Sequence, residues 1–133
     1  MIRRVNLSKE PDAWGLSAPH IEASRKESQG DWSIDFVKTR VTSGAFDLFV
    51  YDDDGVKASA VVAYGDFGTG KIARVIALGG SGGVVDSLLS KFEQCFRDLG
   101  CKRMAFSSLR NGWNRKLKSH GWRETHVVFE KEL

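Results

Sequence analysis

The feature that most constrains the fold is a strand–glycine–helix–strand unit in the second half of the chain. Residues 71–78, KIARVIAL, form a β-rich apolar run, and five small residues at 79–83 follow it directly. Residues 85–99 then carry apolar side chains at three- and four-residue steps, which predicts an amphipathic helix ended by Gly100. Residues 103–109, RMAFSSL, predict a further strand. A single helix between two strands lets them lie parallel in one sheet through a right-handed crossover.

Three predicted strands joined by two short turns lead into this unit. Residues 45–51 and 57–64 are rich in strand-forming side chains, and the sequence between them, DDDG at 52–55, is a hairpin signal. A second turn, GDFGTG at 65–70, connects to the strand at 71–78. An antiparallel meander is therefore expected before the parallel crossover.

The N-terminal part predicts a short strand followed by three helices. Residues 1–6 predict the strand, one helix starts at Pro11, and a second covers residues 18–28. Asp31 is expected to cap a third helix that runs through Val41.

The C-terminal part predicts a short basic helix at 113–120, ended by Gly121, and a last strand at 125–133. The whole order is strand, helices, three strands, helix, strand, helix, strand, which predicts an α+β fold with a mixed sheet. A chain of 133 residues is expected to form a single domain, 1–133.

The distribution of apolar and metal-ligating residues limits the classes of protein to which the chain can belong. The sequence has no apolar stretch long enough to span a bilayer, and residues 1–10 lack the apolar run of a signal peptide. We therefore expect a cytoplasmic-type soluble protein with no membrane partner. The three histidines, His20, His120 and His126, have no clustered acidic or thiol partners, so no metal site is expected.

Positive charge gathers between Cys101 and His126, where seven lysines and arginines accompany one acid, Glu124. Such a surface meets nucleic acids or acidic partners, and Trp113 and Trp122 could add stacking platforms. An ordinary solvated surface explains the same charges.

The order of elements and three motifs resemble the Gcn5-related N-acetyltransferase (GNAT) superfamily. The motifs are GGSGGVVDSLL, RDLGCKRMAFSS and LKSHGWRETHVVFEKEL, in which the pair Gly121-Trp122 replaces the family's common Gly-Phe. The resemblance implies a GNAT-like fold, with an antiparallel meander followed by a parallel β-α-β crossover. In overall look the chain is most similar to compact, divergent GNAT-like proteins of tailed phages. That narrower likeness implies the host cytoplasm or the virion as location, and other virion proteins or a larger assembly as partners.

The resemblance also implies acetyl-CoA as cofactor, with its pyrophosphate at the N-terminus of the helix at 85–99. Free N–H groups and the helix dipole favour an anion there, and glycines let the backbone approach it. The family's Arg or Gln position falls on Gly80 and its second glycine on Val85, so Gly83 alone keeps the signature. The residues that the resemblance assigns to the cofactor are Ile76, Leu78, Gly80, Gly82, Gly83, Val84, Val85 and Asn111.

For the acid and base of the reaction, the sequence departs further from the family. Leu117 occupies the position of the tyrosine that protonates the leaving thiolate in many members, and leucine carries no proton to give. Candidate general bases are Glu124, His126 and Ser107, and each also fits an exposed strand position. Holding the two reactants together accelerates transfer even without a base.

Three functions stay open from the sequence. The departures at Gly80 and Leu117 favour a phage-encoded, virion-associated or accessory structural protein with weak or absent catalysis. The first alternative is an active acetyl-CoA-dependent N-acyltransferase. The second alternative is a nucleic-acid-binding module that uses the basic stretch 102–123.

Overall fold

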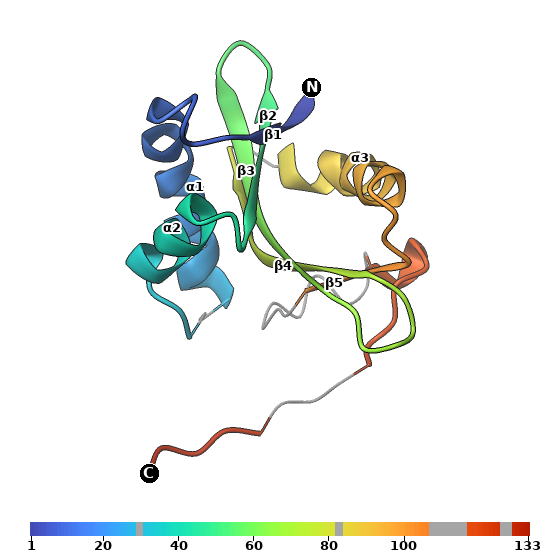
Figure 1. Ribbon diagram of the computed structural model, residues 1–133. Coiled ribbons are helices and arrows are strands. Elements are labelled where there is room, and N and C mark those ends of the chain that lie inside the picture. The colour runs from blue at the N-terminus through green and yellow to red at the C-terminus, as the bar shows by residue number, and fades with distance from the viewer. Residues whose placement is uncertain (29–30, 82–83, 107–116, 126–128) are drawn as a thin grey trace.

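The computed structural model describes the chain except for residues 29–30, 82–83, 107–116 and 126–128 (Figure 1). Its helices and strands follow the predicted order as far as the description reaches. The elements are β1 (Ile2–Val5), α1 (Asp12–Ser28), α2 (Ile34–Thr42), β2 (Asp47–Asp52), β3 (Val56–Gly65), β4 (Ile72–Gly80), α3 (Val84–Asp98) and β5 (Arg103–Phe106).

The described strands form one sheet in the order β1-β2-β3-β4-β5. The first four strands pair antiparallel, and β4 pairs with β5 in parallel, from Ile72 with Arg103 to Val75 with Phe106. Strands that run in the same direction need a crossover, and α3 supplies it. The predicted mixed sheet, with its meander and its crossover, is confirmed.

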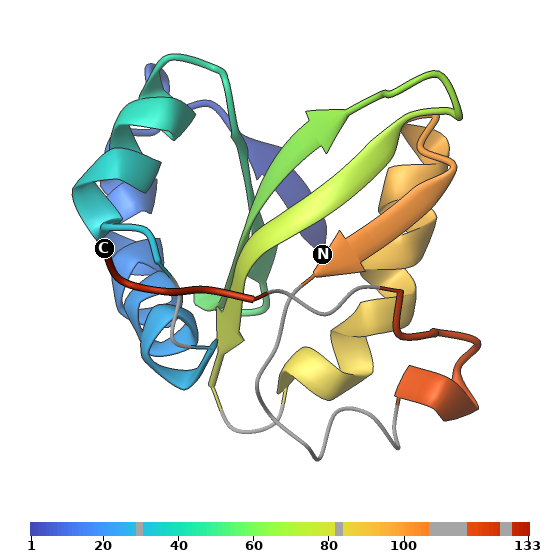
Figure 2. The same ribbon diagram turned by 90° about the horizontal axis from the view of Figure 1, so that it is seen from below.

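A β-bulge lies in β4 just after the last described pair of the parallel strands. Val61 pairs with Ala77 and Val62 with Val75, so Ile76 is an extra residue on β4. A bulge bends its strand and increases the local twist. Among the described residues β5 follows β4 only as far as Val75, while β4 continues past the tip of β5 to Gly80 (Figure 2).

Helices cover both faces of the sheet, with α1 and α2 on one side and α3 on the other (Figure 1). On the first side, Ile21 of α1 and Val37 of α2 pack against Leu48 and Val61. Each of these side chains is fully buried.

On the second side, Leu88, Phe92 and Phe96 of α3 pack against Phe49 and neighbouring strand residues. The rings of Phe49 and Phe96 meet edge to face, with centroids 5.6 Å apart. Burial of each such side chain contributes roughly 1.5–3 kcal/mol. The three-layer packing therefore fixes α3 against the strands that it connects.

The prediction of two separate helices before residue 29 is wrong, because α1 runs unbroken through Pro19. A proline inside a helix removes one backbone hydrogen bond and crowds the preceding turn. The helix buries Ala13, Ser17 and Ile21 along one face, and this burial offsets the cost of the proline.

The N-cap of α2 is Ser33 and not Asp31 as predicted. The Ser33 hydroxyl accepts a hydrogen bond from the N–H of Phe36 at 3.1 Å, and its backbone is extended, as capping requires. Serine and aspartate suit an N-cap equally well, so local preference does not choose between the two positions. The packing of Val37 and Val41 on the sheet selects the later start.

The predicted last strand at 125–133 is wrong for its described part. Residues 129–133 have no regular structure and extend away from the sheet (Figure 1), with Phe129 fully exposed. The predicted helix at 113–120 is described only at its end, where residues 117–119 are helical and Gly121 follows with φ of 84°.

Candidate functional site

The candidate site is the outer edge of β4 between the bulge and the glycine turn. Just before β4, the Lys71 carbonyl accepts a hydrogen bond from the N–H of Lys102. In this part of the strand, the backbone N–H and C=O groups of odd-numbered residues therefore point toward β5. Past the bulge, the backbone groups of odd-numbered residues point toward β3 instead, because the N–H of Ser81 donates to the carbonyl of Lys57. The backbone N–H of Leu78 therefore points to the outer edge, where the described part of β5 does not reach.

Helix α1 meets this edge directly. The N–H of Leu78 donates a hydrogen bond to Oγ of Ser24 at 3.1 Å. At the next residue, Gly79, an added Cβ would lie only 2.1 Å from the carbonyl oxygen of His20. The side chain of His20 turns toward β3, where Nε2 lies 3.4 Å from the Val56 carbonyl. Helix α1 thus forms one wall beside the edge.

The glycine turn connects this edge to the N-terminus of α3. Strand β4 ends at Gly80 and helix α3 begins at Val84, so the predicted order of strand and helix is confirmed. Gly82 and Gly83 themselves lie outside the described residues. The two cations closest along the sequence do not replace the missing Arg or Gln: Lys91 lies over the ring of Tyr51, and Arg74 is exposed on β4.

Of the three candidate general bases, the structure describes only Glu124. Glu124 is exposed and lies in no helix or strand. Ser107, His126 and Asn111 lie outside the described residues. Leu117, at the position of the family tyrosine, is half-buried on the short helix.

Trp122 is packed against the rest of the protein and is not free for stacking on a base. Its indole Nε1 donates to Oε1 of Glu93 at 3.0 Å, and its ring lies 5.2 Å from that of Phe106. Lys102, Arg103, Lys118 and Arg123 are exposed, whereas the other three basic residues of the predicted stretch, Arg110, Arg115 and Lys116, lie outside the described residues.

Three protonatable groups have raised pKa values and stay neutral. Burial, followed by the negative charge of Asp47, raises the pKa of Tyr64. Burial likewise raises the pKa of the thiols of Cys95 and Cys101, which removes any thiolate character at neutral pH. Tyr64 pairs with Ala73, seven residues before Gly80 on β4, and therefore lies about 23 Å along the strand from the glycine turn.

Sequence analysis missed Ser24 and His20, the two α1 residues at the edge of β4. A signal was present, since Ala13, Ser17, Ile21 and Ser24 recur at helical spacing. The pattern predicts one face of a helix against the sheet. It does not reveal which strand that face meets, because that depends on the angle at which α1 crosses the sheet.

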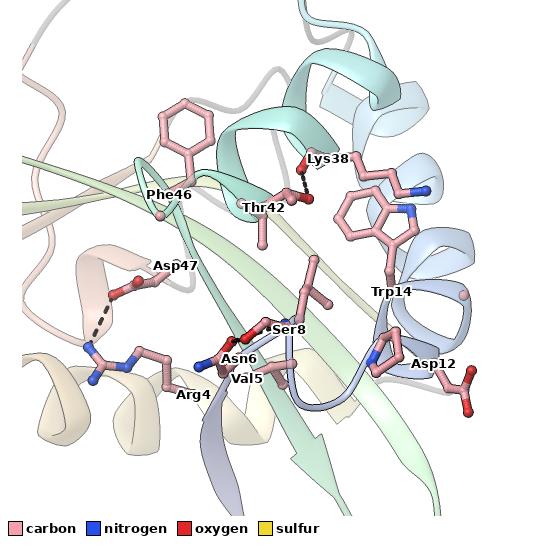
Figure 3. Close-up of a pocket in the computed structure, with 15 residues that line it drawn as sticks. Arg4, Val5, Asn6, Ser8, Asp12, Trp14, Lys38, Thr42, Phe46 and Asp47 are labelled. Atoms are coloured by element: carbon pink, nitrogen blue, oxygen red, sulfur yellow. Dashed lines mark hydrogen bonds and ion pairs between the residues drawn. The ribbon is translucent and has the colours of Figure 1, made fainter.

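An open hollow of about 930 Å³ lies at the other end of α1, among the end of β1, the first turn of α1 and the end of α2 (Figure 3). Trp14 and Lys38 line it, and Arg4 forms an ion pair with Asp47 at 3.6 Å (Figure 3). Inside it, the Asn6 side-chain oxygen accepts hydrogen bonds from the N–H and the hydroxyl of Ser8. The hollow shares no described residue with the predicted site.

Within the described ranges, no three His, Cys, Asp or Glu side chains gather closely enough to hold a metal ion. No helix in those ranges is both long and apolar enough to cross a membrane.

The comparisons with known proteins agree with this geometry at the level of fold. No protein-family model and no curated protein matches the sequence. Solved structures do match over the whole chain. A probable acetyltransferase superimposes with a TM-score of 0.71 at 18% identity, over 100% of this chain and 97% of its own.

Two further structures have named activities. An aminoglycoside acetyltransferase from an uncultured soil metagenomic sample, solved with sisomicin, has a TM-score of 0.69 at 15% identity over 100% and 95% of the two chains. A GNAT family acetyltransferase of Staphylococcus aureus has a TM-score of 0.64 at 15% identity over 100% and 98%. This chain therefore has the fold of the GNAT acetyltransferases.

Proposed function

We propose that the chain binds acetyl-CoA along the outer edge of β4 and transfers the acetyl group to an amine. The observation that carries this proposal is the bulge at Ile76. It turns the N–H of Leu78 outward, beyond the reach of the described part of β5, and β4 then leads into the glycine-rich segment before α3. A strand edge followed by a helix N-terminus suits a ligand that has amide groups at one end and phosphates at the other.

The backbone of Ile76, Leu78 and Gly80 would hold the amide groups of the cofactor's arm. An extended amide chain adds to a free strand edge through main-chain hydrogen bonds. The turn containing Gly82 and Gly83, with the first N–H groups of α3 at Val84 and Val85, would hold the pyrophosphate. The family position of Asn111 adds an amide side chain to this set.

The reaction is an acyl transfer. The amine nitrogen attacks the thioester carbonyl, a C–N bond forms, the C–S bond breaks, and the amine's proton is lost to water or a base. Coenzyme A leaves as the thiol after taking up a proton. With leucine at position 117, the protein contributes mainly by holding the reactants together, which is itself worth several powers of ten.

A second candidate is a GNAT-fold protein without catalysis, used as an accessory or virion-associated part. The half-buried Leu117 in place of the family acid favours it. A phage origin and virion partners stay predictions from the sequence.

Titration with acetyl-CoA in a calorimeter and in a thermal-shift assay tests the proposal. Binding to the folded state raises the apparent melting temperature by mass action. Gly82→Val with Gly83→Val should abolish the shift, while Gly15→Ala, in helix α1 with open space around it, should keep it. An absent shift with the unaltered protein would overturn the proposal.

A second measurement separates the two candidates. Release of free coenzyme A is followed with a panel of primary amines that includes polyamines, aminoglycosides and peptide N-termini. Binding with amine-dependent release supports the transferase. Binding without release for any amine favours the non-catalytic candidate.

A further inference from the structure

The hydrogen bond between Ser24 and Leu78 joins residues 54 positions apart and lies at the candidate site. Leu78 is past the end of the described β4–β5 pairing, so its N–H has no strand partner on this edge among the residues that the structure describes. The Ser24 hydroxyl satisfies this donor in the absence of any ligand. An unsatisfied backbone N–H in a half-buried place is unfavourable, which explains why α1 places a hydroxyl there.

The contact is held by the close packing of α1 on β4. Gly79 lets the His20 carbonyl approach the strand, and Ser24 follows one helical turn later. The same interface contains the hydroxyls of Ser17 and Ser59, both fully buried and without a hydrogen bond among the described residues. Buried polar groups without partners lower the stability of an interface, so α1 is held here less firmly than by an apolar face.

We propose that Ser24 competes with the bound cofactor for the N–H of Leu78. This inference rests on the proposed function. An N–H group makes one strong hydrogen bond, so an amide carbonyl of the cofactor's arm that accepts from Leu78 must displace the Ser24 hydroxyl. Binding then exchanges one acceptor for another, and it releases the C-terminal half of α1 from the edge of β4.

The competition gives Ser24 an effect opposite to that of an ordinary binding residue. Ser24→Ala removes the competitor and leaves the N–H of Leu78 unpaired in the free protein. We expect this variant to bind acetyl-CoA about fivefold more tightly, the size of one net hydrogen bond. Alanine is a strong helix former, so α1 should remain intact. Ser24→Thr keeps a hydroxyl acceptor at the same position and should bind as the unaltered protein does.

Amide hydrogen exchange at Leu78, measured by NMR on the ¹⁵N-labelled full chain, provides a readout that needs no activity. Without cofactor, exchange at Leu78 should be slow in the unaltered protein and in Ser24→Thr, because both keep a hydroxyl acceptor. It should be at least several times faster in Ser24→Ala. With saturating acetyl-CoA, all three proteins should protect Leu78 equally, because the cofactor then supplies the acceptor.

The outcomes distinguish this inference from the proposed function. Binding by the unaltered protein, with Ser24→Ala equal or weaker, overturns the competition and leaves the function intact. Unchanged Leu78 exchange in free Ser24→Ala also overturns it. Absence of binding by all three proteins overturns both proposals. Tighter binding by Ser24→Ala together with its faster Leu78 exchange supports the competition.

Discussion

The carbonyl group of His20 lies directly against Gly79. A Cβ added at Gly79 would be 2.1 Å from the carbonyl oxygen and 2.8 Å from the carbonyl carbon, and both atoms belong to the backbone. Since backbone atoms cannot rotate away, this position on β4 accepts only glycine while α1 stays in place. The packing reason for Gly79 is therefore independent of any phosphate, although the residue stands at the start of the glycine turn.

Gly79→Ala is expected to lower the free energy of unfolding by about 1–3 kcal/mol, because α1 must shift to admit the methyl group. Urea denaturation followed by circular dichroism measures the change. Gly15→Ala is the matched control, since nothing lies within 4 Å of an added Cβ at that helical position. The control should raise stability by about 0.5–1 kcal/mol. A stabilising Gly79→Ala would contradict the close approach of α1.

Ser33→Ala is expected to cost about 1 kcal/mol of stability, because it removes the hydroxyl that accepts the Phe36 N–H at the start of α2. The same denaturation experiment on Asp31→Ala should show a change within about 0.5 kcal/mol, as for an exposed residue outside the helix. A larger loss of stability in Asp31→Ala than in Ser33→Ala would identify Asp31 as the N-cap, as the sequence alone predicts.

Stability should fall as the pH rises above about 9, and Tyr64 should account for part of the fall above about pH 10. Its pKa is raised by burial and by Asp47 from an ordinary value of 10.0, so the unfolded chain loses the phenol proton first. The folded state is then disfavoured from pH 10 upward, whereas below pH 10 the phenol is neutral in both states. The raised pKa values of Cys95 and Cys101 start a similar loss at about pH 9.

The urea concentration at the midpoint of unfolding, determined with reductant present at several pH values between about 8 and 11, measures this loss of stability. Tyr64→Phe should lose less stability over the upper part of this range than the unaltered protein. Tyr51→Phe keeps Tyr64 and should show the full loss. A Tyr64→Phe variant that loses as much stability as the unaltered protein would exclude a buried neutral phenol.

The repeating parts of the fold could be predicted because their signals are local. The alternating strands of the meander and the amphipathic pattern of α3 each occupy a continuous run of sequence, and Gly100, with φ of 83°, ends α3 as predicted. The parallel pairing of β4 with β5 follows from these elements, since one helix between two strands leaves few other connections.

Other elements could not be predicted from local patterns. Proline is a strong local signal for a helix break, yet α1 continues through Pro19 because its face toward the sheet is buried along several turns. At 125–133 the alternating pattern favours a strand, but a strand forms only where a neighbouring edge is in register with it. Residues 129–133 have no such partner among the described residues.

The sequence by itself determined the mixed sheet and its crossover helix, because periodicity and turn residues act over short distances along the chain. Tertiary structure alone decided the site at the edge of β4. The bulge at Ile76 arises from the register between β3 and β4. The bond from Leu78 to Ser24 arises from how closely α1 crosses that strand. Both depend on contacts between segments that are far apart in sequence. A local sequence pattern does not indicate which residues of such segments will be in contact.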